Sequence, residues 1–118
     1  MITTVPGIGP GSWDAGKLAR EQEQSAQTPD TQAIVYRLYT EAKDTLADIV
    51  SRYFAGATFT FTVGLWQGTP EDSTVIEIIG TRADMQSIAH LAGDIRLANN
   101  QTSVLVTWHP ISRLDVTA

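Results

Sequence analysis

The stretch FTFTVGLWQGTPEDSTVIEII, Phe59 to Ile79, alternates large apolar residues with threonine and then passes into a segment rich in turn residues. Alternation with a period of two is the pattern of a β-strand with one face on the core. We therefore predict a strand over residues 57–66 and a turn at QGTPED. Ser73 to Ile79, apolar on both faces apart from Glu77, is predicted to be the returning inner strand.

The same alternation gathers four residues on the side of the first strand that faces away from the core. These residues are Thr58, Thr60, Thr62 and Trp66. An indole on an otherwise polar face has two interpretations. Tryptophan is enriched in subunit interfaces, so the four residues can form an interface with another copy of the chain. An indole is also a stacking surface for a nucleobase, so the face can be a ligand floor.

Helical patterns flank this hairpin on both sides. Thr28 and Pro29 are suitable for the N-cap and the first position of a helix that Gly56 ends. The apolar stripe of this predicted helix recurs at steps of three and four residues: Ile34, Val35, Leu38, Ala42, Leu46, Ile49, Val50 and Tyr53. Thr81 to Asp84 resembles a capping box, and a second stripe follows it until Asn99 and Asn100. That stripe comprises Met85, Ile88, Leu91, Ala92 and Ile95.

The last elements complete an α+β prediction. Ser103 to Trp108 is expected to be a third strand with Val104, Val106 and Trp108 on one face, and residues 113–117 a short fourth strand. The order α-β-β-α-β-(β) predicts a two-layer sandwich, with a mainly antiparallel sheet and helices on one face. We expect one domain over residues 29–118, preceded by an N-terminal arm over residues 1–28 that is flexible or docks on a neighbouring subunit.

Composition excludes several classes of function. The 118 residues carry a formal charge of −5, which argues against nucleic-acid binding through phosphate neutralisation. The chain has no cysteine, so disulfides and thiolate metal sites are excluded. Its beginning shows neither the pattern of a signal peptide nor that of a membrane span. We therefore expect a cytoplasmic protein that does not bind membranes.

Catalytic and metal-binding patterns are weak. His90 and His109 are the two histidines and lack the spacing of metal ligands. Glu71, Asp72 and Glu77 are candidates for paired carboxylates, although acidic residues in turns are usually solvated. The chain contains no phosphate-binding glycine loop and no nucleophile elbow. We expect no catalytic residues, no metal and no cofactor, with a small hydrolase or lyase that uses Glu77 and His109 as an alternative.

Three consecutive amides, Asn99, Asn100 and Gln101, follow the second predicted helix in the segment LANNQTSVLVTWH. Each amide offers a donor and an acceptor, which suits a base edge or a ribose hydroxyl. Asparagine also caps helices and accepts left-handed geometry, so at least one of the three is expected to be only a cap.

The hairpin GLWQGTPEDSTVIEI, a helix and then NNQTSVLV resemble the small phage-encoded proteins that sequester cyclic nucleotide immune signals, in particular the Thoeris anti-defence sponges. The resemblance covers roughly residues 56–108. It implies a non-enzymatic homo-oligomer with helices at the subunit interfaces. It also implies that a cyclic ADP-ribose derivative or a cyclic oligonucleotide is held between subunits by an aromatic ring, amides and arginines.

Carried onto this chain, the resemblance implies six ligand-binding residues. Trp66 or His90 would supply the stacking ring, Asn99, Asn100 and Gln101 the amides, and Arg113 the phosphate partner if the C-terminal segment turns back. The expected function is sequestration of a nucleotide-derived signal by a homo-oligomer in the host cytoplasm, to block host immunity. The alternative is a phage accessory protein with a structural or interaction role and no small ligand.

Overall fold

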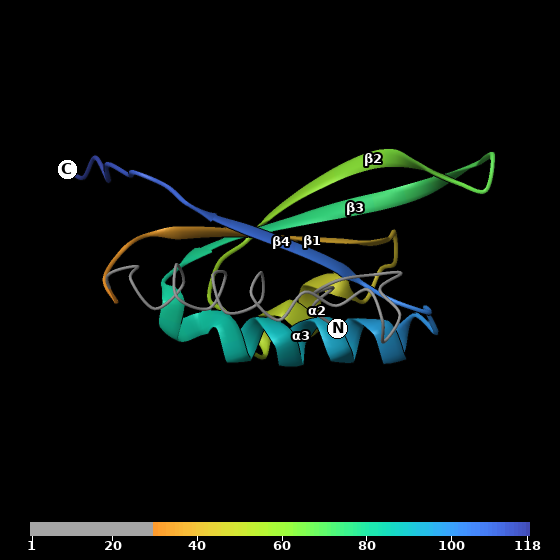
Figure 1. Ribbon diagram of the computed structural model, residues 1–118, viewed down its shortest axis with the longest axis horizontal. Helices are drawn as coiled ribbons and strands as arrows, with labels where there is room; N and C mark the ends of the chain where they lie inside the picture. The colour runs from red at the N-terminus through yellow and green to blue at the C-terminus, as the bar shows by residue number, and fades with distance from the viewer. Residues whose placement is uncertain (1–29) are drawn as a thin grey trace, which may run out of the picture.

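The computed structural model describes residues 30–118, which form one four-stranded sheet with helices on one face (Figure 1). The elements are β1 (Ile34–Glu41), α2 (Leu46–Ser51), β2 (Thr58–Trp66), β3 (Thr69–Gly80), the 3-10 turn η1 (Arg82–Asp84), α3 (Met85–Ala98) and β4 (Leu105–Pro110). The strand order is β2-β3-β1-β4, and every neighbouring pair is antiparallel. This β-α-β-β-α-β order is the ferredoxin-like arrangement. The predicted α+β class is confirmed. The segment predicted to be an N-terminal arm, residues 1–28, lies outside the described residues.

The predicted first helix, from Pro29 to Gly56, is wrong. Its first half is strand β1 and only Leu46–Ser51 is helical. β1 is an inner strand, so apolar residues lie on both of its faces, and Val35 is as well buried as Ile34. Such a strand has no clean alternation, and its apolar positions also fit a helical spacing. Pairing with β3 on one side and β4 on the other decides the conformation.

The turn between β2 and β3 is shorter than predicted. Trp66 pairs with Thr69, so the loop consists of Gln67 and Gly68 alone. Both have positive φ, 48° and 81°, which is the geometry of a type I′ hairpin turn and explains the glycine. Pro70 belongs to β3 instead of the turn, at a position that β1 does not reach, so its missing N–H removes no bond to β1.

The C-terminal segment also differs from the prediction. Residues 111–118 have no regular secondary structure, so the short fourth strand at residues 113–117 is wrong. The third predicted strand is present as β4, shifted by two residues. Its register pairs Val106 with Leu38 and Trp108 with Tyr36, which confirms that the predicted apolar positions share one face.

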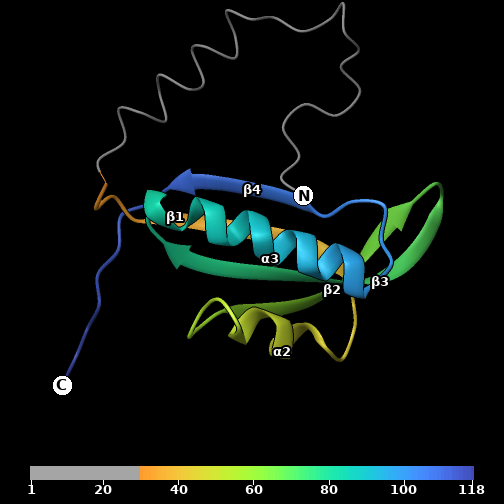
Figure 2. The same ribbon diagram turned by 90° about the horizontal axis from the view of Figure 1, so that it is seen from below.

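The core lies between the sheet and the two helices, which cover one face side by side (Figure 2). Ile88, Leu91, Ala92 and Ile95 of α3 are buried, as their spacing predicted. The predicted capping box is also present, since the Asp84 carboxylate accepts a hydrogen bond from the Thr81 N–H at 2.8 Å. These contacts fix the helices on a single face and leave the other face of the sheet without cover from residues 30–118.

The β2–β3 hairpin is longer than the rest of the sheet. β1 pairs with β3 only as far as Ser73, so residues 63–72 continue as two strands alone. We call this two-stranded part the arm; it leaves the body of the molecule at one end of the sheet (Figure 1). Phe61 at its root and Val63 and Leu65 within it are 80%, 67% and 74% exposed. Apolar side chains so exposed in a row are uncommon on a protein that works as a monomer.

Candidate binding groove

The face of the sheet that points away from the helices, called the open face, is defined by the strand register. Thr58 pairs with Glu77, Thr60 with Val75, Thr62 with Ser73 and Trp66 with Thr69. Paired residues share a face, and the alternate residues Ile76 and Ile78 are buried beneath the helices. The register therefore places Thr58, Thr60, Thr62 and Trp66 on the open face, as the alternation predicted.

A groove of about 610 Å³ lies where the arm leaves the sheet. Its walls come from β2, from β3, from the end of β1 and from the segment before β4. The lining residues are Tyr39, Thr40, Glu41, Thr62, Val63, Gly64, Leu65, Trp66, Glu71, Ser73, Thr74, Val75, Thr102 and Ser103. Two aromatic rings, two carboxylates and several hydroxyl groups therefore line one concavity, and none of the lining residues is Lys, Arg or His.

Trp66 and Tyr39 give the groove its stacking surfaces. Trp66 is 64% exposed at the last position of β2, and Tyr39 is 38% exposed on β1. Gly64 interrupts the threonine series between Thr62 and Trp66 for a steric reason, because a Cβ there would lie 2.6 Å from the Ser73 Oγ. The glycine thus lets the two strands of the arm pair closely in the groove wall.

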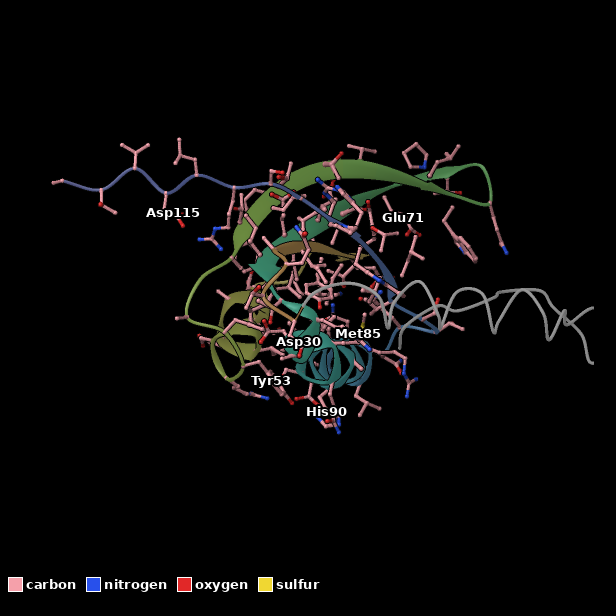
Figure 3. All side chains as sticks on the ribbon, turned by 60° about the vertical axis from the view of Figure 1, so that its left-hand side comes forward. Asp30, Tyr53, Glu71, Met85, His90 and Asp115 are labelled. Carbon is pink, nitrogen blue, oxygen red and sulfur yellow. The ribbon has the colours of Figure 1, made fainter. Side chains whose placement is uncertain are left out.

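The groove contains two carboxylates, which only accept hydrogen bonds, and several hydroxyl groups, which both donate and accept. The carboxylates belong to Glu41 and Glu71, and Figure 3 shows Glu71 on the arm. The Thr74 side chain belongs to the wall, is fully buried, and its Oγ1 has no hydrogen-bond partner among the described residues. A ligand that offers N–H or O–H donors together with a planar ring matches this set of groups.

The three amides of the predicted site hold the end of α3 against β1. Asn99 Nδ2 donates to Thr40 Oγ1 at 3.2 Å and to Gln101 Oε1 at 2.8 Å, and the Thr40 hydroxyl itself donates to Gln101 Oε1. Gln101 Nε2 donates to the Ser103 carbonyl at 3.2 Å. Asn100 has a φ of 54°, the left-handed geometry that follows a helix end. Asn100 therefore has the left-handed geometry considered for one amide, whereas Asn99 and Gln101 bond Thr40, and the Asn99 Oδ1 has no hydrogen-bond partner among the described residues.

The remaining predicted ligand residues lie far from the groove. His90 is exposed on the outer side of α3, in the helix layer (Figure 3). Arg113 forms an ion pair with Asp115 at 2.9 Å, and the hydrogen bond that it donates to that carboxylate raises the pKa of the guanidinium. Arg113 also lines a second hollow of about 420 Å³ beside Thr58 and Glu77. Of the six predicted ligand residues, only Trp66 lines the groove.

The structure does not assemble the predicted alternatives for catalysis. Glu71 and Glu77 are six residues apart on one strand, which separates them by about 20 Å. Glu77 instead forms an ion pair with Arg37 at 3.0 Å. His109 is on β4, with β1 between it and the strand of Glu77, a separation of about 10 Å. Within residues 30–118, no group of three His, Asp or Glu side chains could hold a metal ion.

The sequence prediction missed most of the groove residues. It places Tyr39, Thr40 and Glu41 in a helix and Ser103 at the start of the third strand. Tyr39 and Thr40 are both residue types that favour strands, and that was the available signal. These residues lie in the same groove as Trp66 because of the register of three strands, and local sequence does not determine that register.

Comparison with known proteins gives a fold and no family. No family model matches the chain, and no curated protein matches it. A DUF3240 family protein from Shewanella baltica has a similar crystal structure, with a TM-score of 0.56 and 15% identity over 74% of this chain and 98% of that chain. At this identity the similarity shows the shared fold alone. No helix within residues 30–118 is long and apolar enough to span a membrane.

Proposed function

We propose that this protein is a non-enzymatic binding protein, active as a homo-oligomer, that holds a small ring-containing ligand in the groove beside Trp66. The observation that carries the proposal is an indole that is 64% exposed at the rim of a concavity of about 610 Å³. Exposing an indole to water is unfavourable, and binding a planar ligand or another subunit removes that cost. Tyr39 supports the same proposal from β1, which lies on the other side of β3 from the strand of Trp66.

The ligand class that fits best is a nucleotide-derived signal, such as a cyclic ADP-ribose isomer or a cyclic oligonucleotide. A base can stack on Trp66, and its exocyclic amine can donate to Glu41 or Glu71. Ribose hydroxyls can bond the hydroxyl groups that line the groove. Because no lining residue is cationic, the groove of one subunit suits the base and ribose, and the phosphates would lie toward solvent or another subunit. Sequestration in the cytoplasm of an infected cell, to block its immunity, is part of this proposal.

The proposal is tested by uptake and recovery of candidate ligands. The protein is incubated with cyclic ADP-ribose isomers and cyclic oligonucleotides, separated from free ligand, and examined by native mass spectrometry; heating then releases the ligand for identification. We expect one intact ligand per groove. A chemically altered ligand would indicate catalysis, and no uptake of any candidate would contradict the proposal.

A matched pair of variants locates the site. Trp66→Ala removes the indole at the groove, whereas Trp108→Ala removes an indole that is 41% exposed on the helix side of β4. Loss of one stacked base is expected to weaken binding by about tenfold or more, since base–aromatic stacking contributes about 1–3 kcal/mol. Equal affinities of the two variants would contradict the assignment of the groove.

A second function, an interaction protein without a small ligand, is favoured by a different observation. Phe61, Val63 and Leu65 expose an apolar row along β2, and Val63 and Leu65 also line the groove. This row suits contact with a protein surface. Self-association without ligand uptake in the experiment above would favour this function over ligand sequestration.

A further inference from the structure

We infer that β2 forms the subunit interface by pairing edge to edge with β2 of a second copy, antiparallel and centred on Thr62. The inference rests on the self-association in the proposed function and specifies its surface and register. It joins two four-stranded sheets into one continuous sheet across a two-fold axis. Such an isologous contact uses the same strand on both copies.

The free edge of β2 lacks the features that prevent an edge strand from pairing with a strand of another chain. β2 is the outer strand of the sheet and consists of the nine residues TFTFTVGLW, without a charge or a proline. Edge strands of proteins that stay monomeric usually carry charges, proline or a bulge, or they are very short. The opposite edge follows this rule, because β4 has six residues and ends at Pro110. The contrast assigns the intermolecular edge to β2.

The hydrogen-bonding groups at this edge have a definite direction. In a two-residue hairpin the residues that flank the turn exchange both main-chain hydrogen bonds, so Trp66 and Thr69 form such a pair. Along β2 the main-chain groups alternate in direction. The N–H and C=O groups of Phe59, Phe61, Val63 and Leu65 therefore point away from β3, toward the free edge. These groups can form about eight hydrogen bonds with the same residues of a second copy.

Pairing centred on Thr62 uses the whole strand. Position 62 is the middle of Thr58–Trp66, so this register places all nine residues opposite a partner, whereas any other register leaves one end of each copy's strand unpaired. Phe59 then faces the partner's Leu65, and Phe61 faces the partner's Val63. These apolar pairs lie on one face, where cross-strand contacts between aromatic and aliphatic side chains stabilise a sheet. No like charges meet, because β2 has none.

The same register provides a place for the exposed indole. Thr58 faces the partner's Trp66 on the open face. Beside Thr58 lies the hollow of about 420 Å³ whose walls include Phe54, Glu77 and Ile79. The partner's Trp66 reaches this hollow from the end of the paired strand, while its other side lines its own groove. The register thus explains why an indole occupies a position in the threonine series.

The pairing also completes the ligand groove. Thr62, Gly64 and Trp66 line the groove and belong to the paired strand. The partner's β2 therefore extends the wall of each groove beyond the edge of its own sheet. A ligand bound there contacts both subunits.

Engineered disulfides test the register directly, because the natural chain has no cysteine. Thr62→Cys places two cysteines opposite each other across the two-fold axis, at a non-hydrogen-bonded position where Cβ atoms are about 4.5–5.5 Å apart. Thr60→Cys is the register control: it faces Gly64, and its own counterpart lies more than about 10 Å away. Thr107→Cys is the edge control, exposed on the open face of β4. Each variant is oxidised with oxidised glutathione and analysed on non-reducing gels, alongside light scattering of the natural protein.

We expect Thr62→Cys to form the covalent dimer at least tenfold faster than either control, and light scattering to give the mass of a dimer or a multiple of it. A dimer in which Thr60→Cys or Thr107→Cys cross-links as fast as Thr62→Cys would overturn the register and leave self-association intact. A monomer at every concentration would overturn self-association and this inference together, and ligand uptake would then be judged separately. Thr62→Lys adds a second test: two facing ammonium groups should weaken the dimer at least tenfold, whereas Thr107→Lys should not. A dimer that tolerates Thr62→Lys overturns the inference.

Discussion

Replacing Tyr36 with phenylalanine tests how the first strand is tied to the start of α3. Tyr36 is fully buried, and its hydroxyl donates to the Thr81 carbonyl at 2.6 Å. Tyr36→Phe keeps the ring and removes this bond. The carbonyl still accepts from the Asp84 N–H at 3.0 Å, so it keeps one partner. We therefore expect Tyr36→Phe to lower the free energy of unfolding by about 1–1.5 kcal/mol, the lower part of the usual range for a lost buried hydrogen bond.

The ionisation of Tyr36 also predicts how the free energy of unfolding changes with pH. Burial, followed by the nearby charge of Asp84, raises the pKa of Tyr36 from 10.0 to about 12. The pKa of Tyr36 is higher in the folded protein than in the unfolded chain. Its contribution to the free energy of unfolding is therefore complete below pH 10 and is lost as the pH rises to 12. The loss is about 1.4 kcal/mol at pH 11, since one pKa unit corresponds to that energy. The stability curves of natural protein and Tyr36→Phe should therefore cross near pH 11.

Urea unfolding monitored by circular dichroism, from pH 8 to 11.5, measures the free energy of unfolding of both proteins. At pH 8 the variant should lose about 1–1.5 kcal/mol of unfolding free energy, or roughly 5 °C in Tm. Tyr39→Phe is the control: it removes a hydroxyl from the open face of the same strand and should change stability by less than about 0.5 kcal/mol. A Tyr36→Phe protein as stable as the natural one at pH 8, or a difference that does not change with pH, would refute the reasoning.

Three further changes test the hairpin, the helix start and the open face. Gly68→Ala forces a side chain into a φ of 81° and should cost about 1 kcal/mol, whereas Gly56→Ala, which meets no atom within 4 Å, should change stability much less. Asp84→Ala removes the acceptor for the Thr81 N–H and should cost about 1 kcal/mol; it should also reduce the loss of stability between pH 10 and 12, because the Asp84 charge helps to raise the pKa of Tyr36. Glu77→Gln breaks a partly exposed ion pair with Arg37, so we expect a loss of at most about 1 kcal/mol that disappears in about 1 M salt. Urea titrations measure all three. A larger loss for Gly56→Ala than for Gly68→Ala, or a Glu77→Gln effect that does not depend on salt, would contradict the assignments.

The parts of the fold with a single exposed face could be predicted from the sequence. Alternation between Thr58 and Trp66 gives the strand and its two faces. The prediction that the apolar face lies on the core is wrong beyond Phe59, because the arm extends past the helices and leaves Phe61, Val63 and Leu65 exposed. The spacing of Ile88, Leu91 and Ile95 gives α3, because these residues share its buried face. β1 could not be predicted, because Val35 and Tyr39 place apolar residues on its open face as well, and its apolar positions also fit a helical spacing.

The candidate site could be predicted only at Thr62 and Trp66, which alternation places on the open face. Their exposure follows from alternation alone, which is a local property. The groove also needs Tyr39 and Glu41, and these meet Trp66 only because β1 and β2 flank β3 in one register. The amides of Asn99 and Gln101 could not be assigned from sequence, since their partner, Thr40, is about sixty residues earlier in the chain.

Amide hydrogen exchange along β2, measured by NMR at several protein concentrations, tests the central claim most directly. If a second copy covers the free edge, the N–H groups of Phe59, Phe61, Val63 and Leu65 become protected as the concentration rises through the dimer range. Those of Thr60 and Thr62, which bond β3, stay protected throughout. Fast exchange at the four edge residues at every concentration would contradict the claim.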